Sequence, residues 1–113
     1  MYKVIWLTKL NGDRSREDAD RHWATVHAGL MKDVPGLERY VQNLWVAPVD
    51  PAIPGPALLH LHSEAWFADE AAYTAAMATP QWAAVAADSP NCFDNTALVG
   101  AVVEERLVYD RQR

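Results

Sequence analysis

The spacing of apolar and polar residues changes several times along the chain, and these changes predict its strands and helices. Residues 2–10 alternate in two-residue steps, which is typical of a β-strand. From Ser15 onward, apolar residues recur every three or four positions, as on one face of a helix, until Pro35 and Gly36 end the pattern. The residues expected on the buried stripe of this helix are Ala19, Trp23, Val26 and Leu30.

The second half of the chain repeats these patterns. Residues 37–46 predict a second strand and residues 57–67 a third, on either side of a loop with four prolines. Asp69 begins a second helix, Thr79 interrupts it, and Pro80 begins a short third helix. Residues 97–109 predict the last strand. The order is β-α-β-β-α-β, which predicts one α+β domain over residues 1–113 with the ferredoxin-like motif.

In that arrangement both main helices cover one face of a four-stranded sheet and leave the other face bare. The alternation assigns Val4, Trp6, Tyr40 and Trp66 to the bare face. A large uncovered apolar face is unusual in a monomer. We therefore expect a homodimer whose sheets pack face to face and close a barrel, with one pocket in each subunit.

Composition narrows the class of protein. The net charge of −5 argues against a nucleic-acid or anionic-membrane surface, and no apolar run is long enough to span a membrane. The N-terminal stretch is interrupted by lysines and does not resemble a signal peptide, so we expect a cytoplasmic protein. Its single cysteine, Cys92, excludes an internal disulfide and stands in a loop far from any histidine, so we expect an idle thiol.

Residues with acid–base chemistry concentrate first between Ser15 and Asn43. His27 follows Trp23 by one helical turn and is either a general acid or base or a hydrogen-bonded structural histidine. Tyr40 shares one face of the second strand with Gln42. The Tyr40 hydroxyl either donates a hydrogen bond to a substrate oxygen or lies at the surface above a core ring.

A second group of residues with acid–base chemistry lies within the third predicted strand. There His60, His62, Glu64 and Trp66 share one face. The two histidines begin ~6.6 Å apart and could converge on a metal, but Glu64 begins ~13 Å from His60. No third ligand is evident, so we expect no metal. We expect His62 and Glu64 to line a polar pocket in which burial raises the pKa of Glu64, and a structural carboxylate is the alternative.

Three tryptophans, Trp6, Trp23 and Trp66, either form an aromatic wall for a flat ligand or belong to the ordinary core. Five tryptophans in 113 residues favour a ring-shaped ligand. The sequence contains no glycine-rich phosphate loop, serine nucleophile elbow or CxxC motif. These absences remove the common phosphate, serine-hydrolase and thiol-redox chemistries from consideration.

Three motifs together resemble the EthD-like family: W-x-x-x-H at 23–27, P-G-L-x-R-Y-V-Q-N at 35–43 and E-x-W-F at 64–67. The resemblance covers nearly the whole chain and implies a dimeric α+β barrel. It implies activities such as methylmuconolactone isomerase, polyketide dehydratase or cyclase, and catabolic accessory protein, with cofactor-free monooxygenases among related barrels. The residues that match the family's histidine, tyrosine, glutamate and tryptophan are His27, Tyr40, Glu64 and Trp66.

Two departures from the family pattern concern the third strand. Ala65 stands where methylmuconolactone isomerases carry a cysteine. His60 replaces an aspartate of many members, and His62 replaces a common aliphatic residue. The resemblance therefore implies a more basic and polar pocket than usual, with a different substrate.

Together with these observations, the resemblance implies a cofactor-independent acid–base enzyme, of isomerase, dehydratase or cyclase type, acting on a small oxygenated ring compound of aromatic catabolism or polyketide tailoring. His27 would move the proton, Tyr40 would stabilise charge on oxygen, and Glu64 would be the second acid–base group. The substrate-binding residues would be Trp6, Trp23, Gln42, His62 and Trp66. The alternatives are a cofactor-free monooxygenase of a hydroquinone-like substrate and a non-catalytic ligand-binding accessory protein of an oxygenase system.

Overall fold

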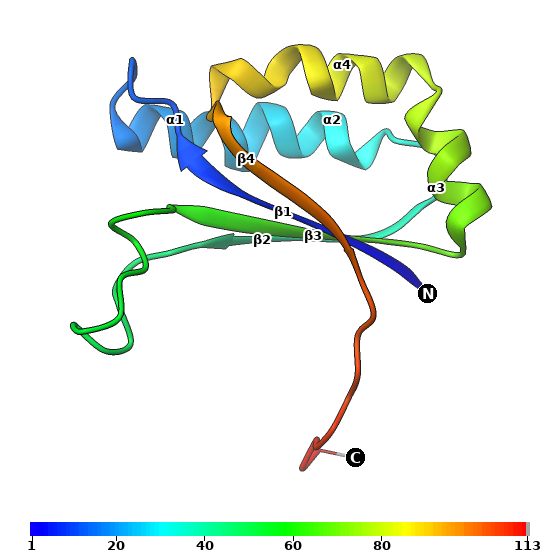
Figure 1. Cartoon of the computed structure of the whole chain (residues 1–113). Helices are drawn as coiled ribbons and strands as arrows, with labels where there is room; N and C mark the ends of the chain where they lie inside the picture. Colours follow the sequence, from blue (N-terminus) through cyan, green and yellow to red (C-terminus); the bar gives the residue numbers. More distant parts are fainter. Residues whose placement is uncertain (113) are drawn as a thin grey trace.

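A computed structural model describes residues 1–112 as an antiparallel four-stranded sheet with the helices on one face (Figure 1). The strands are β1 (Tyr2–Leu10), β2 (Leu37–Leu44), β3 (Leu61–Phe67) and β4 (Phe93–Val103), in the order β2-β3-β1-β4. The helices are α1 (Arg16–His22), the π-helical turn η1 (Trp23–His27), α2 (Ala28–Lys32), α3 (Glu70–Met77), α4 (Pro80–Asp88) and the 3₁₀ turn η2 (Ser89–Asn91). The predicted ferredoxin-like order is confirmed. Within these residues, no helix is long and apolar enough to cross a membrane.

One continuous helical segment runs from α1 through η1 to α2 along the sheet (Figure 1). Ser15 caps it, because its Oγ accepts the backbone N–H of Asp18 at 3.1 Å. In η1 the turn is wider than in an α-helix, and the backbone N–H of Ala28 reaches the carbonyl five residues back. As a result, the buried positions recur every four residues: Ala19, Trp23, His27 and Met31.

This wide turn makes one prediction wrong. The α-helical period predicts that Val26 is buried, but its side chain is 50% exposed. His27, which was expected beside the buried stripe, is 4% exposed. The extra residue in the π-helical turn rotates His27 toward the sheet and Val26 toward solvent.

The predicted starts of the two later helices are confirmed, whereas the limits of two strands are not. Asp69 caps α3, and Thr79 caps α4 with Pro80 at its first position. The third strand begins at Leu61 rather than at residue 57, and β4 covers residues 93–103 rather than 97–109. Beyond residue 103 the chain has no strand to pair with, because β1 begins at Tyr2. Residues 104–112 therefore leave the sheet on the side away from the helices (Figure 1).

The assignment of side chains to the two sheet faces also differs from the prediction. Trp6 stacks on Trp82 of α4 with the ring centroids 5.7 Å apart, so this side of β1 faces the helices. Val4 shares that side, and Tyr40 packs into the core between the helices and the sheet. The expectation that Val4, Trp6 and Tyr40 lie on the bare face is therefore wrong, and of that group only Trp66 lies there.

The uncovered face has an apolar part and a charged part. The strand registers place on it the apolar residues Ile5, Leu7, Val41, Val99, Ala101 and Val103. In the charged part, Lys3 forms ion pairs of 2.8 Å with Glu64 and Glu105. Lys3 and Arg39 each lie over the ring of Trp66, at 4.5 and 4.6 Å from its centroid.

Candidate active site

A cavity of about 240 Å³ lies between the helix-covered face of the sheet and the helices. Its apolar walls come from Trp6, Met31, Leu61, Trp82, Val85 and Phe93. The polar side chains that reach it are Thr8, His27, Tyr40, Ser63, Ser89 and Asn95. An apolar cavity with a few convergent polar groups is the usual form of a small-molecule site.

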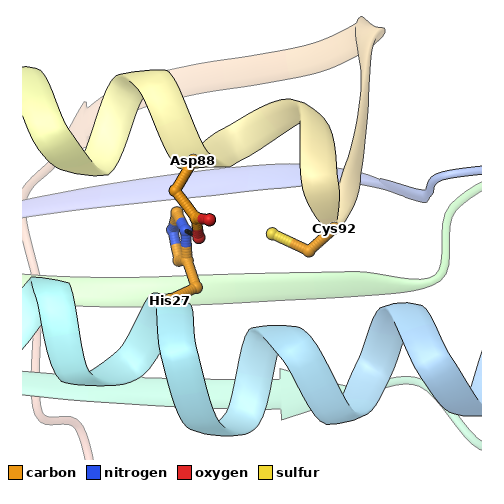
Figure 2. Close-up of side chains that lie close together, drawn as sticks. All are labelled: His27, Asp88 and Cys92. Atoms are coloured by element: carbon orange, nitrogen blue, oxygen red, sulfur yellow. Dashed lines mark hydrogen bonds and ion pairs between the residues drawn. The ribbon is translucent and has the colours of Figure 1, made fainter.

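His27 is carried into this cavity by η1 and is held there by Asp88, the last residue of α4. Nδ1 of His27 lies 3.0 Å from Oδ2 of Asp88 (Figure 2). The other carboxylate oxygen, Oδ1, accepts hydrogen bonds from His22 at 2.7 Å and Asn91 at 3.1 Å. Burial acts to raise the pKa of Asp88, but these three hydrogen bonds outweigh it and lower the pKa. Asp88 is therefore ionised at neutral pH.

The state of the His27 ring follows from this contact. Burial lowers the pKa of His27 more than Asp88 raises it, so the imidazole is neutral at pH 7. Because an ionised carboxylate can only accept, the ring proton is on Nδ1 and Nε2 carries the lone pair. Within residues 1–112 the His27 ring makes no other hydrogen bond, and the residue lines the cavity. This is the arrangement required of a general base.

Tyr40 lines the same cavity from β2. Its hydroxyl accepts the side-chain N–H of Gln42 at 3.2 Å, and the same amide nitrogen donates to the carbonyl of Trp23 at 2.9 Å. Gln42 thus joins β2 to the π-helical turn that carries His27. Burial raises the pKa of Tyr40 and outweighs the hydrogen bond from Gln42, which lowers it, so the hydroxyl keeps its proton at neutral pH. Because the oxygen already accepts a hydrogen bond from Gln42, its own proton is available to a ligand oxygen.

Three potential metal ligands, His27, Asp88 and Cys92, lie within 4.8 Å of one another (Figure 2). Imidazole, carboxylate and thiolate are donors that Zn²⁺ accepts. However, His27 and Asp88 are bonded to each other, and burial raises the pKa of Cys92 to about 12. At neutral pH the group is therefore a hydrogen-bonded pair beside an uncharged thiol. This state does not favour binding of a metal ion, because a thiol ligates zinc as the thiolate.

The comparisons with known proteins identify the family. The model of the EthD domain matches residues 12–96. The chain belongs to the EthD family. An EthD-family structure from Bacillus halodurans superposes with a TM-score of 0.77 at 24% identity, covering 94% of this chain and 99% of that one. No curated protein matches the chain.

Two other solved structures share the fold of this EthD domain. A dimeric ferredoxin-like protein of unknown function from Thermobifida fusca has a TM-score of 0.69 at 16% identity, covering 90% of this chain and 88% of its own. A hydroxynitrile lyase from Passiflora edulis has a TM-score of 0.65 at 14% identity, covering 94% of this chain and 95% of its own. At these identities the likeness shows the fold alone.

Among the tryptophans expected to hold a ring, only Trp6 lines the cavity of the EthD domain. Trp23 is 1% exposed and packs edge-on against Phe93, with the ring centroids 6.0 Å apart. Trp66 lies on the opposite sheet face. Trp82, which the sequence pattern did not single out, stacks on Trp6 and forms the second aromatic wall. Gln42 contacts Tyr40 and Trp23 rather than the cavity.

The polar residues of β3 are not brought to His27 and Tyr40. Glu64 and His62 point to the uncovered face, because Ser63 and its alternate neighbours take the helix side. The hydrogen bond from Lys3 lowers the pKa of Glu64, so the expected rise is wrong. His62 Nδ1 accepts the indole N–H of Trp45 at 2.8 Å. His60 lies just before β3, and its Nδ1 accepts a hydrogen bond from the backbone N–H of Leu10 at 3.0 Å.

The sequence pattern missed Asp88 and His22. Asp88 lies 61 residues beyond its partner His27, and no local spacing connects them. One signal was available: Asp88 ends a helix, where the helix dipole disfavours a carboxylate. A carboxylate in that position needs donors from elsewhere, and the two histidines and Asn91 supply them.

Proposed function

We propose that this EthD domain is a cofactor-independent acid–base enzyme that isomerises, dehydrates or cyclises a small oxygenated ring compound. The observation that supports it is the hydrogen-bonded pair of His27 and Asp88. Within the described part of the chain, His27 keeps Nε2 without a hydrogen bond and lines the apolar cavity together with Tyr40. His27 would take a proton from a carbon next to a carbonyl group. Tyr40 would donate to the oxygen on which negative charge develops. Both groups have the required protonation state at neutral pH.

The cavity walls support a ring-shaped substrate. Trp6, Trp82 and Phe93 line the cavity with aromatic side chains; Trp6 stacks on Trp82, and Phe93 lies edge-on to His27 at 5.1 Å between ring centroids. Aromatic walls of this kind favour a planar ligand over a flexible chain. The volume of about 240 Å³ suits a small compound rather than a long acyl chain or a peptide.

We also propose that the protein is a homodimer formed through the uncovered sheet face. That face carries a row of apolar side chains that are half-buried on β1 and exposed on β4, including Val99 at 56% exposure. The segment after β4 extends beyond this face (Figure 1) and exposes Leu107, Val108 and Tyr109. A second copy would cover both surfaces, and the Thermobifida fusca neighbour is described as dimeric.

The test is turnover of a panel of lactones, phenols and polyketide-like rings by the purified protein. His27→Ala should lower kcat/KM by ~10²-fold or more, the effect of a lost general base. Val26→Ala, on the outer side of the same turn, is the matched control and should retain activity. Dialysis against a chelator should leave activity unchanged, because no step uses a metal.

Three outcomes would contradict this proposal. Near-normal turnover by a folded His27→Ala variant would remove His27 from the mechanism. Tight binding without any product in the wild type would assign the cavity to a ligand-binding accessory protein. Activity that requires dioxygen would assign it to a cofactor-free monooxygenase.

A further inference from the structure

One carboxylate, that of Asp88, is shared by two histidines. Its Oδ2 is 3.0 Å from His27 Nδ1, and its Oδ1 is 2.7 Å from His22 Nε2. The exposed fraction of the side chain increases along this row, from 5% at His27 to 10% at Asp88 and 19% at His22. The three groups therefore connect the wall of the cavity with the protein surface.

The π-helical turn allows both histidines to reach the same carboxylate. Five positions separate His22 from His27, and residues five apart on a regular α-helix point about 140° away from each other. The turn η1 begins directly after His22 and ends at His27, and its i to i+5 bonding places both side chains on the side of α4. Single π-helical turns occur frequently at functional sites.

We propose that His22 is a positioning residue that acts on His27 through Asp88. By donating to one carboxylate oxygen, His22 fixes the plane of Asp88, so that the other oxygen orients the imidazole of His27. The charge of His22 acts on the pKa of His27 in the same direction as burial, so it also makes His27 a weaker base. The inference rests on the proposed function, since orientation affects turnover only if His27 moves a proton.

The groups that face His27 differ in how they affect its pKa. The α4 helix contributes Asp88, which is ionised, and β2 contributes the hydroxyl of Tyr40. The chain after α4 contributes the thiol of Cys92. Burial raises the pKa of both Tyr40 and Cys92, so neither changes charge near neutrality. Burial has the largest effect on the pKa of His27, and the charge of His22 acts in the same direction.

The primary test follows the ring nitrogens of His27 by ¹⁵N NMR across a pH titration of the ligand-free protein. His22→Gln keeps an N–H donor but cannot carry charge, so the pKa of His27 should rise. His22→Ala also removes the donor, so the Nδ1–H tautomer of His27 should no longer be the single form. Arg21→Gln is the matched control. It removes the positive charge next to His22, but the Arg21 side chain pairs with Asp18 and not with Asp88, so the titration of His27 should be unchanged.

Kinetics on an identified substrate provide the second readout. In His22→Gln the acid limb of the kcat/KM profile should move to higher pH, while the plateau above it stays within about three-fold. In His22→Ala kcat should fall by about ten-fold or more at similar KM, as when the orienting partner of a functional histidine is lost. An unchanged His27 titration in both variants overturns the proposal. A shifted titration in a protein that converts no ring compound upholds the coupling and refutes the proposed function instead.

Discussion

Replacing Asp88 by asparagine changes one heavy atom and tests the whole arrangement around His27. The carboxylate accepts hydrogen bonds from His22 at 2.7 Å, His27 at 3.0 Å and Asn91 at 3.1 Å. An amide of the same shape has one acceptor oxygen and one NH₂ group. In Asp88→Asn, at least one of the two imidazoles must therefore face a donor where it now faces an acceptor.

The size of the effect depends on which imidazole faces the NH₂ group. With the amide oxygen held by His22 and Asn91, the NH₂ group faces His27, whose proton must then move to Nε2. The lone pair is no longer on the free nitrogen, so kcat/KM should fall by ~10²–10⁴-fold, or about 3–5 kcal/mol in activation free energy. The free energy of unfolding should fall by about 1–3 kcal/mol, because charge-assisted hydrogen bonds become neutral ones.

Three measurements on the same preparations check this prediction. Steady-state kinetics give the loss of kcat/KM, urea unfolding gives the stability, and ¹⁵N NMR gives the tautomer of His27. Asn91→Ala is the control, because it removes one bond to the carboxylate without changing its charge. Full turnover in Asp88→Asn, with the proton of His27 still on Nδ1, would show that the carboxylate does not set the tautomer of His27.

Three further predictions concern the interface, the pH dependence of stability and the cavity wall. Val99→Asp should make the proposed dimer monomeric in light scattering, since a carboxylate buried at an interface costs several kcal/mol, whereas Val26→Asp on the outer helix surface should not. A monomeric wild type would contradict the proposed interface. The free energy of unfolding should fall as pH drops below 6.5, because the pKa of His27 is lower in the folded protein and the unfolded chain binds the proton more readily. This loss of stability at low pH should be smaller in His27→Gln. If the free energy of unfolding, measured with urea, falls equally with pH in the wild type and the variant, His27 is not its source. Gly100→Ala places a Cβ 3.1 Å from Cδ1 of Trp6, so the indole should shift, with a loss of ~1–3 kcal/mol in stability and weaker binding of ring ligands; unchanged melting and affinity would exclude this contact.

The order of strands and helices could be predicted because its signals are local. Alternation marks β1, and the caps at Ser15 and Asp69 lie next to the helices that they begin. The face of the sheet that the helices cover is not a local property. β1 is apolar on both sides, with Trp6 on one and Ile5 on the other, so alternation separates the two sets without assigning them. Which side of β1 faces the helices depends on Trp82, which is distant from Trp6 in the sequence but stacks on it in the fold.

The candidate site was predictable to the same extent. His27 and Tyr40 lie in one short stretch, and their residue types and spacing pointed to acid–base chemistry. Glu64 was correctly grouped with Trp66 on one face of β3, but the grouping could not tell which face it was. Asp88 was missed because its contact with His27 depends on the packing of two helices and on a π-helical turn. No residue pattern in the sequence predicts that turn.

The π-helical turn contains one residue more than a regular helix needs, so the helical segment can differ in length without changing which residues face the sheet. In-frame loss of one codon within 24–26 would leave a regular α-helix in which His27 and Met31 take the next two buried positions after Trp23. Both side chains would then still face the sheet. A lineage with this fold can therefore gain or lose one residue here by a single insertion or deletion while the base and the cavity wall stay in place.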